Sequence, residues 1–127
     1  MKYAFTLIEL MIVVVILGVV ATFLIPNFSN TRERAADTEV ATMLQSIKSA
    51  EKMYRMRNDS DRYVACTNTT LCEGQLGLDL QGDGLWNYSV TTTMSGTLFE
   101  AKAKRLTTPS RTWIVNESSE PEKCTSC

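Results

Sequence analysis

The chain has 127 residues, of which 44% are apolar, and a formal net charge of -1 from 13 basic and 14 acidic side chains. This length suits one small domain with an appended element, and the charge balance offers no basic surface for nucleic acid. Histidine is absent, which removes the commonest metal ligand and the commonest general base at neutral pH. We therefore expect a non-enzymatic protein with no metal site and no cofactor.

Residues 5–25 form an apolar run that Thr6, Glu9, Gly18 and Thr22 alone interrupt. As a helix this run would reach about 30 Å, the thickness of a bilayer's hydrocarbon. A cleaved secretory signal is the competing interpretation, but the run is longer than the apolar core of such signals. We expect a membrane-spanning helix, with Lys2 on the cytoplasmic side and the rest of the chain outside the cytoplasm.

Glu9 is the anomaly of this segment, because a carboxylate inside a bilayer costs about 2.5 to 3.5 kcal/mol on insertion scales. It could reach the lipid headgroups from its place near the start of the helix. It could belong to an ion or proton path, although a single acid provides no relay. It could also await a positive partner from another subunit, since buried charges are normally paired.

The stretch Ala4-Phe5-Thr6-Leu7-Ile8-Glu9, the apolar residues that follow to Gly18, and Pro26 resemble the N-terminal signature of type IV pilins and type II secretion pseudopilins. The resemblance implies that a membrane prepilin peptidase cuts between Ala4 and Phe5, releases residues 1–4 as a leader and methylates Phe5. Ala4 stands where the family usually has glycine, and a small residue still suits a tight peptidase subsite.

The resemblance also gives residues 5–26 two roles, first as a membrane anchor and then as the helix through which subunits polymerise. Glu9 would pair with the N-terminal amine of a neighbouring subunit. Gly18 and Pro26 both disfavour a regular helix, by about 1 and 3 kcal/mol, so we expect the stretch between them to loosen on assembly.

Residues 27–127 are expected to form the globular domain. Ala36, Val40, Met43, Ile47, Ala50 and Tyr54 recur at intervals of four and three, which predicts one helical stripe that packs on a sheet. The pattern is amphipathic, because polar residues lie just before and between these positions: Arg32, Glu33, Asp37, Glu39, Gln45, Lys48, Glu51 and Lys52. The helix should end near Arg57, before the polar cluster that starts at Asn58.

Residues 58–84 are typical of a loop, and residues 117–127 of an irregular tail. Alternating apolar and polar residues predict strands at 86–93, at 99–104 and at 111–116, with turns at 94–96 and 107–110. The expected fold is α+β: a long N-terminal helix, membrane-spanning in its first half and amphipathic in its second, packed on a three-stranded antiparallel β-meander.

Cys66, Cys72, Cys124 and Cys127 all follow the apolar segment, which favours structural disulfides in an oxidising compartment. We favour Cys66–Cys72 with Cys124–Cys127, while a link from the loop to the C-terminal end is nearly as well supported. Reduced buried thiols, a redox pair at Cys124 and Cys127, and a zinc site are less favoured. Asp79 and Asp83 lie near glycines, but a turn is a better interpretation than a calcium loop.

The function implied by the resemblance is that of a structural subunit of a type IV pilus filament, serving adhesion, motility or DNA uptake. The alternatives are a pseudopilin of a type II secretion system, a monomeric membrane-anchored binding domain that uses residues 58–84, and a thiol oxidoreductase. Implied partners are other copies of the chain, the prepilin peptidase, the inner-membrane assembly platform and, before assembly, membrane lipid. The subunit would move from the inner membrane to a cell-surface filament.

Overall fold

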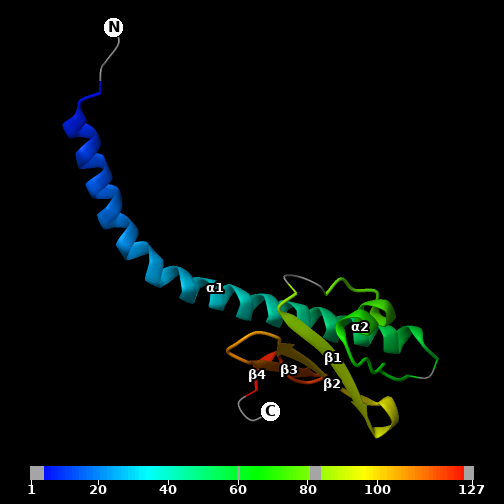
Figure 1. Cartoon of the computed structure of the whole chain (residues 1–127). Helices are drawn as coiled ribbons and strands as arrows, with labels where there is room; N and C mark the ends of the chain where they lie inside the picture. The colour runs from blue at the N-terminus through cyan, green and yellow to red at the C-terminus, as the bar shows by residue number, and fades with distance from the viewer. Residues whose placement is uncertain (1–4, 60, 81–83, 125–127) are drawn as a thin grey trace. The chain divides into compact units, whose positions relative to one another are not determined.

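The computed structural model describes residues 5–59, 61–80 and 84–124, without the side chains of residues 24–27 and 29. It divides into two compact units, Met1–Asp37 and Thr38–Cys127. The elements in chain order are α1 (Leu7–Arg57), α2 (Thr69–Leu76), β1 (Trp86–Thr93), the 3-10 turn η1 (Met94–Gly96), β2 (Leu98–Arg105), β3 (Thr112–Asn116) and β4 (Glu122–Lys123) (Figure 1).

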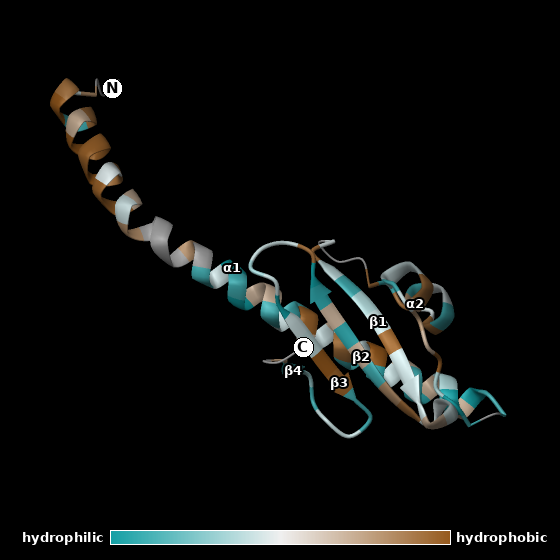
Figure 2. Cartoon of the chain, turned by 60° about the horizontal axis from the view of Figure 1, so that its bottom comes forward, coloured by the Kyte–Doolittle hydropathy of each residue, from teal (hydrophilic) through white to brown (hydrophobic). Residues whose placement is uncertain are grey.

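The first unit contains the N-terminal part of α1. This helix begins at Leu7 and continues through Gly18 and Pro26 to Arg57, so its C-terminal end lies at the predicted residue. Its first turns are coloured as strongly apolar in Figure 2. Among the described residues, no helix combines the length and the apolar character needed to cross a membrane. The span expected over residues 5–26 therefore stays a prediction.

The second unit has its core between the C-terminal part of α1 and one face of the sheet. Val40, Leu44 and Ile47 on the helix are fully buried in one apolar cluster with Val90, Ala101 and other sheet residues. Val40, Ile47 and Ala50 of the predicted stripe lie on the packed face, with Met43 and Tyr54 at its partly buried margin. Leu44 is buried there too, although it was not part of the predicted stripe. Glu51 departs from the amphipathic pattern, since this member of the polar set between the stripe positions has an exposed fraction of 0%. The helical spacing puts Glu51 four residues after Ile47, on the core side.

The sheet is an antiparallel meander in the order β1-β2-β3-β4. The first three strands confirm the predicted ones, and Tyr88, Ala103 and Trp113 stand in register on the core face. The expected number of strands was wrong, because β4 adds a fourth at the edge, pairing Glu122 and Lys123 with β3. Two consecutive charged residues carry no apolar alternation, so this strand leaves no signal in the sequence.

A second correction falls in the expected loop of residues 58–84, which contains the helix α2. Asn68 caps its start by accepting a hydrogen bond from the Leu71 N–H at 2.9 Å. Gly77 ends it in the left-handed conformation, with φ of 67°. Cys72 and Leu76 are its buried residues. Eight residues with so few apolar positions give too short a periodic pattern for sequence-based recognition.

The structure joins Cys66 to Cys72 in a disulfide, which is the favoured pairing for these two residues. The second expected pair ends on Cys127, and the suggested calcium loop includes Asp83; both residues lie outside the described part of the chain. Among the described residues, no group of three potential metal ligands occurs.

Candidate assembly site in the N-terminal segment

The start of α1 is organised around Thr6 and Glu9, three residues apart. The Glu9 N–H donates to the Thr6 carbonyl oxygen at 3.1 Å and to the Thr6 hydroxyl at 3.3 Å. The Thr6 hydroxyl lies 3.4 Å from Glu9 Oε2 and donates to it. Thr-x-x-Glu is the sequence pattern of a capping box, so the helix end fixes the position of the carboxylate. Sequence reasoning missed this role of Thr6, although the spacing itself was the signal.

Glu9 has a hydroxyl partner, and the part of the chain that the structure describes supplies it with no cation. Within residues 5–59, 61–80 and 84–124, no basic side chain forms a salt bridge with it. A carboxylate in the first turn is favoured by the helix dipole, which places partial positive charge at the N-terminal end. The stabilisation of the carboxylate by the helix dipole is small. Glu9 can therefore still form an ion pair with a fully charged cation.

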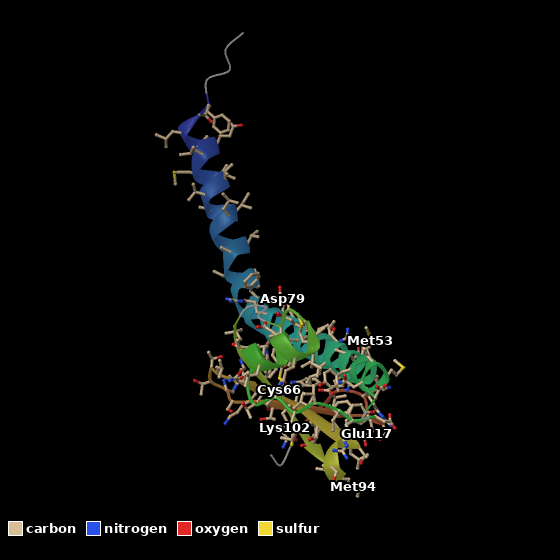
Figure 3. All side chains as sticks on the ribbon, turned by 90° about the vertical axis from the view of Figure 1, so that its right-hand side faces the viewer. Met53, Cys66, Asp79, Met94, Lys102 and Glu117 are labelled. Atoms are coloured by element: carbon tan, nitrogen blue, oxygen red, sulfur yellow. A yellow bond between two sulfur atoms is a disulfide. The ribbon has the colours of Figure 1, made fainter. Side chains whose placement is uncertain are left out.

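Around Glu9 the helix presents an almost continuous apolar surface. Phe5 is 71% exposed and Leu7 79% exposed, and the large apolar side chains onward to Phe23 are also exposed. Figure 3 shows the side chains of this segment projecting from the ribbon on all sides. Ile8, Met11, Ile12, Val15 and Ile16 line a shallow apolar groove on one of these faces. Contiguous apolar surface of this extent marks contact with lipid or with protein.

The structure brings two of the predicted assembly residues, Phe5 and Glu9, within about one helical turn of each other. Gly18 lies further along the same helix, with open space where a Cβ would stand. Ala4 and the side chain of Pro26 lie outside the described part of the chain. Cys66 and Cys72 belong to the second unit, so the disulfide is no part of this site.

Comparison with known proteins bears on this segment directly. Residues 1–25 match the family model described as the prokaryotic N-terminal methylation motif. The type II secretion system core protein G of Vibrio cholerae serotype O1 is 41% identical over 54 residues, which are 42% of this chain and 37% of that protein. The type IV major pilin protein PilA of Myxococcus xanthus is 44% identical over 64 residues, covering 50% of this chain and 28% of that protein.

A third relative, the type IV wide pilus major component PilA4 of Thermus thermophilus, is 45% identical over 56 residues, covering 44% of this chain and 43% of that protein. The chain thus spans less than half the length of each of these relatives. No solved structure matches it.

The fold and the motif define a class of protein with an N-terminal methylation motif, an exposed apolar helix and a small α+β domain. In its N-terminal part the chain is similar to type IV pilins and to type II secretion pseudopilins. Both branches occur among these similar proteins, so the comparisons leave the choice between them open.

Proposed function

We propose that this chain is a structural subunit of a type IV pilus filament, cut between Ala4 and Phe5 and assembled through residues 5–26. The observation that carries the proposal is the exposed apolar start of α1 with the Glu9 carboxylate inside it and no cation of the described residues beside it.

The apolar surface supplies the driving force. Burying a leucine, isoleucine or valine side chain is worth about 1.5 to 3 kcal/mol, so a helix with such side chains on every side is stable only when it is covered. Lipid can cover the helix of a single subunit, and the helices of other copies can cover it in a filament. Assembly then moves the helix from one apolar environment to another, so apolar burial alone does not favour the filament over the membrane. A more specific interaction must do so.

Glu9 supplies that specific interaction. Cleavage before Phe5 creates a terminal amine, and methylation of this amine retains its positive charge. In a low-dielectric environment an unpaired carboxylate and an unpaired ammonium are each costly, and pairing them relieves both costs. An incoming subunit therefore gains most where its Phe5 amine meets the Glu9 of a copy already in place. Thr6 holds that carboxylate at the helix end, where an amine can reach it.

The test compares Glu9→Gln, which keeps the shape of the side chain without its charge, with Glu39→Gln on the same helix outside the apolar segment. Cells are sheared, and the subunit is measured in the sheared and the membrane fractions. Glu9→Gln should reach the membrane like the wild type and be nearly absent from the sheared filaments, above all in competition with wild-type subunits. Glu39→Gln should assemble normally. Abundant filaments of Glu9→Gln would contradict the proposal.

A pseudopilin of a type II secretion system is the second candidate, because several of the similar proteins are core protein G of such systems. The same helix and the same Glu9 pairing would then build a short filament that stays within the cell envelope. Deletion of the gene separates the two. Loss of sheared surface filaments with normal protein secretion supports the pilus, whereas retention of normally secreted proteins in the periplasm supports the pseudopilin.

A further inference from the structure

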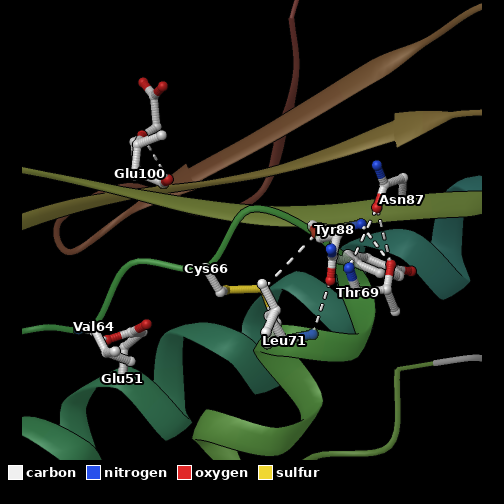
Figure 4. Close-up of a disulfide and its surroundings, with 11 residues drawn as sticks. Glu51, Val64, Cys66, Thr69, Leu71, Asn87, Tyr88 and Glu100 are labelled. Atoms are coloured by element: carbon white, nitrogen blue, oxygen red, sulfur yellow. Dashed lines mark hydrogen bonds between the residues drawn. A yellow bond between two sulfur atoms is a disulfide. The ribbon is translucent and has the colours of Figure 1, made fainter.

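Glu51 is the buried carboxylate of the second unit, and neither the motif nor the proposed function uses it. Its side chain is fully buried on the core side of α1. Oε2 accepts a hydrogen bond from the Val64 N–H at 3.0 Å, while Oε1 is buried without a hydrogen-bond partner. Figure 4 shows Glu51 on the helix directly beside Val64. A carboxylate in this position is normally paired, because a buried charge with one donor is expensive.

Val64 belongs to the strap, which we define as residues 61–66, the segment between the end of α1 and the disulfide. On its sheet side the strap is held by backbone hydrogen bonds. The Tyr63 N–H donates to the Gly96 carbonyl at 2.8 Å, and Cys66 and Val90 exchange two bonds, at 3.0 and 2.8 Å. On its helix side Glu51 is the buried attachment, through the intervening Val64 amide. The strap ends at Cys66, which is 2% exposed.

The other charged groups around Glu51 have partners elsewhere. On α1, Lys48 donates to the Ser119 carbonyl at 2.6 Å. Arg55 donates to the Asp61 carboxylate of the strap at 2.6 and 3.0 Å and to the Tyr63 hydroxyl at 3.4 Å.

From the sheet side, Glu117 accepts from the Phe99 N–H at 3.3 Å. Lys52 and Arg62, the remaining cations of α1 and the strap near this point, are exposed. Within the described part of the chain no cation forms a salt bridge with Glu51. Its ionisation is therefore opposed by burial without a compensating charge.

We propose that Glu51 is a proton-operated latch, which holds the strap against α1 when its carboxyl group is neutral and releases the strap when the group is ionised. The neutral carboxyl keeps the bond from Val64 and leaves only an uncharged oxygen without a partner. The ionised group keeps the same bond but buries a negative charge. Opening of the strap admits water to this charge, so the open form gains relative to the closed one.

The direction of the pH dependence follows from linkage. Burial raises the pKa of Glu51 from 4.5 to about 7, against a smaller opposite effect of the Val64 N–H. In the open form the group is solvated and titrates near its ordinary value. Between these values opening releases a proton, so the opening equilibrium should rise up to about tenfold per pH unit. The latch is firmest below pH 4.5, weakens as pH rises, and changes no further once pH has passed about 7.

Amide hydrogen exchange of the full chain in detergent micelles tests the latch. After correction for the intrinsic exchange rate, protection of the Val64 amide in the wild type should fall between pH 5 and 7 and then level off. In Glu51→Gln it should be constant over this range, while Glu39→Gln should keep the wild-type profile. Equal pH profiles in the wild type and Glu51→Gln would overturn the proposal.

A second measurement needs no variant, and it therefore decides the case even if Glu51→Gln does not fold. Carbon-13 NMR of the wild type follows the Glu51 carboxyl together with the Val64 amide. Titration of the carboxyl near 7, with the amide shifting in parallel, supports the latch. Titration in the ordinary range of an exposed glutamate overturns it. Because neither measurement involves filaments, failure of the latch and failure of the proposed function are distinguishable.

Discussion

The two units of this chain share the helix α1, but large apolar side chains are exposed in the first unit, whereas those that face the sheet are buried in the second. Leu17 is 62% exposed in the first unit, and Leu44 is fully buried in the second. Both are leucines in the middle of a helix, so intrinsic propensity does not separate them. The difference is that the sheet covers Leu44 from within the chain, whereas the described residues provide no such cover for Leu17. An apolar pattern therefore indicates that a surface will be covered, and only the rest of the fold shows whether the same chain covers it.

The two glutamates extend the comparison to charge. Glu9 is exposed at the helix start and held by a threonine hydroxyl, and Glu51 is buried and held by a backbone amide. An exposed carboxylate can take its cation from another molecule, whereas an enclosed one can lower its cost only by binding a proton or by opening the structure around it.

The strongest test of the comparison is a matched pair of leucine truncations. Leu44→Ala should reduce the free energy of unfolding by about 2 to 5 kcal/mol, because it removes a fully buried side chain and leaves a cavity. Leu17→Ala should change it by less than about 0.5 kcal/mol. Urea unfolding in detergent, followed by tryptophan fluorescence, measures both. Similar losses for the two variants would mean that the first unit has a cover within the chain.

The disulfide tests how far the second unit depends on covalent closure. Its two cysteines are separated by 6 positions. Replacement of both Cys66 and Cys72 by alanine should cost about 2 kcal/mol, since a closed loop this short removes only a limited part of the unfolded chain's entropy. In urea unfolding the reduced wild type should lose at least as much, because reduction also opens the disulfide of Cys124. No loss in either sample would place the stability of this region entirely in its apolar packing.

The buried Glu51 should make the free energy of unfolding depend on pH. Because burial raises its pKa to about 7, the stability of the wild type should be highest near pH 4.5 and should fall as pH rises to about 7. We expect a loss of about 3 kcal/mol across this window that is missing in Glu51→Gln. Glu9→Gln retains Glu51 and should follow the wild-type profile. Unfolding free energies at pH 4.5, 6 and 8 provide the measurement.

The smallest expected effect concerns α2. Asn68→Ala removes the side-chain cap of this helix and should cost about 1 kcal/mol, whereas Asn68→Asp keeps an acceptor and should cost much less. Urea midpoints of the three proteins compare them directly. Equal midpoints would show that the disulfide and the burial of Leu76 hold α2 without its cap.

The sequence predicted those elements whose residues follow a periodic apolar pattern or a turn signal. The helix end at Arg57, the turn at 94–96 and the first three strands follow from regular apolar spacing and from turn residues. It did not predict α2 or β4, which are short and depend on a single cap or on backbone pairing to a neighbour. The burial of Glu51 was missed because a polar residue is normally assigned to the solvent side, although its helical position pointed to the core.

The functional contacts likewise include some that the sequence indicates and some that it does not. Phe5 and Glu9 are recognisable from the signature of the segment, and the Thr-x-x-Glu spacing held the further information that Thr6 contacts the carboxylate. The buried contact between Glu51 and Val64 joins residues thirteen positions apart, and no local pattern encodes such a pair.

The margins of the sheet have a consequence for how copies of this chain can join. On the outer side of β1, the Tyr88 amide donates to the Thr69 hydroxyl at 3.1 Å and the Val90 amide donates to Cys66. At the opposite margin, β4 consists of two exposed charged residues. In the described ranges neither border offers a long row of free amides and carbonyls, which cross-β stacking requires. We therefore expect these margins to resist uncontrolled strand addition, as a subunit of the proposed filament would require.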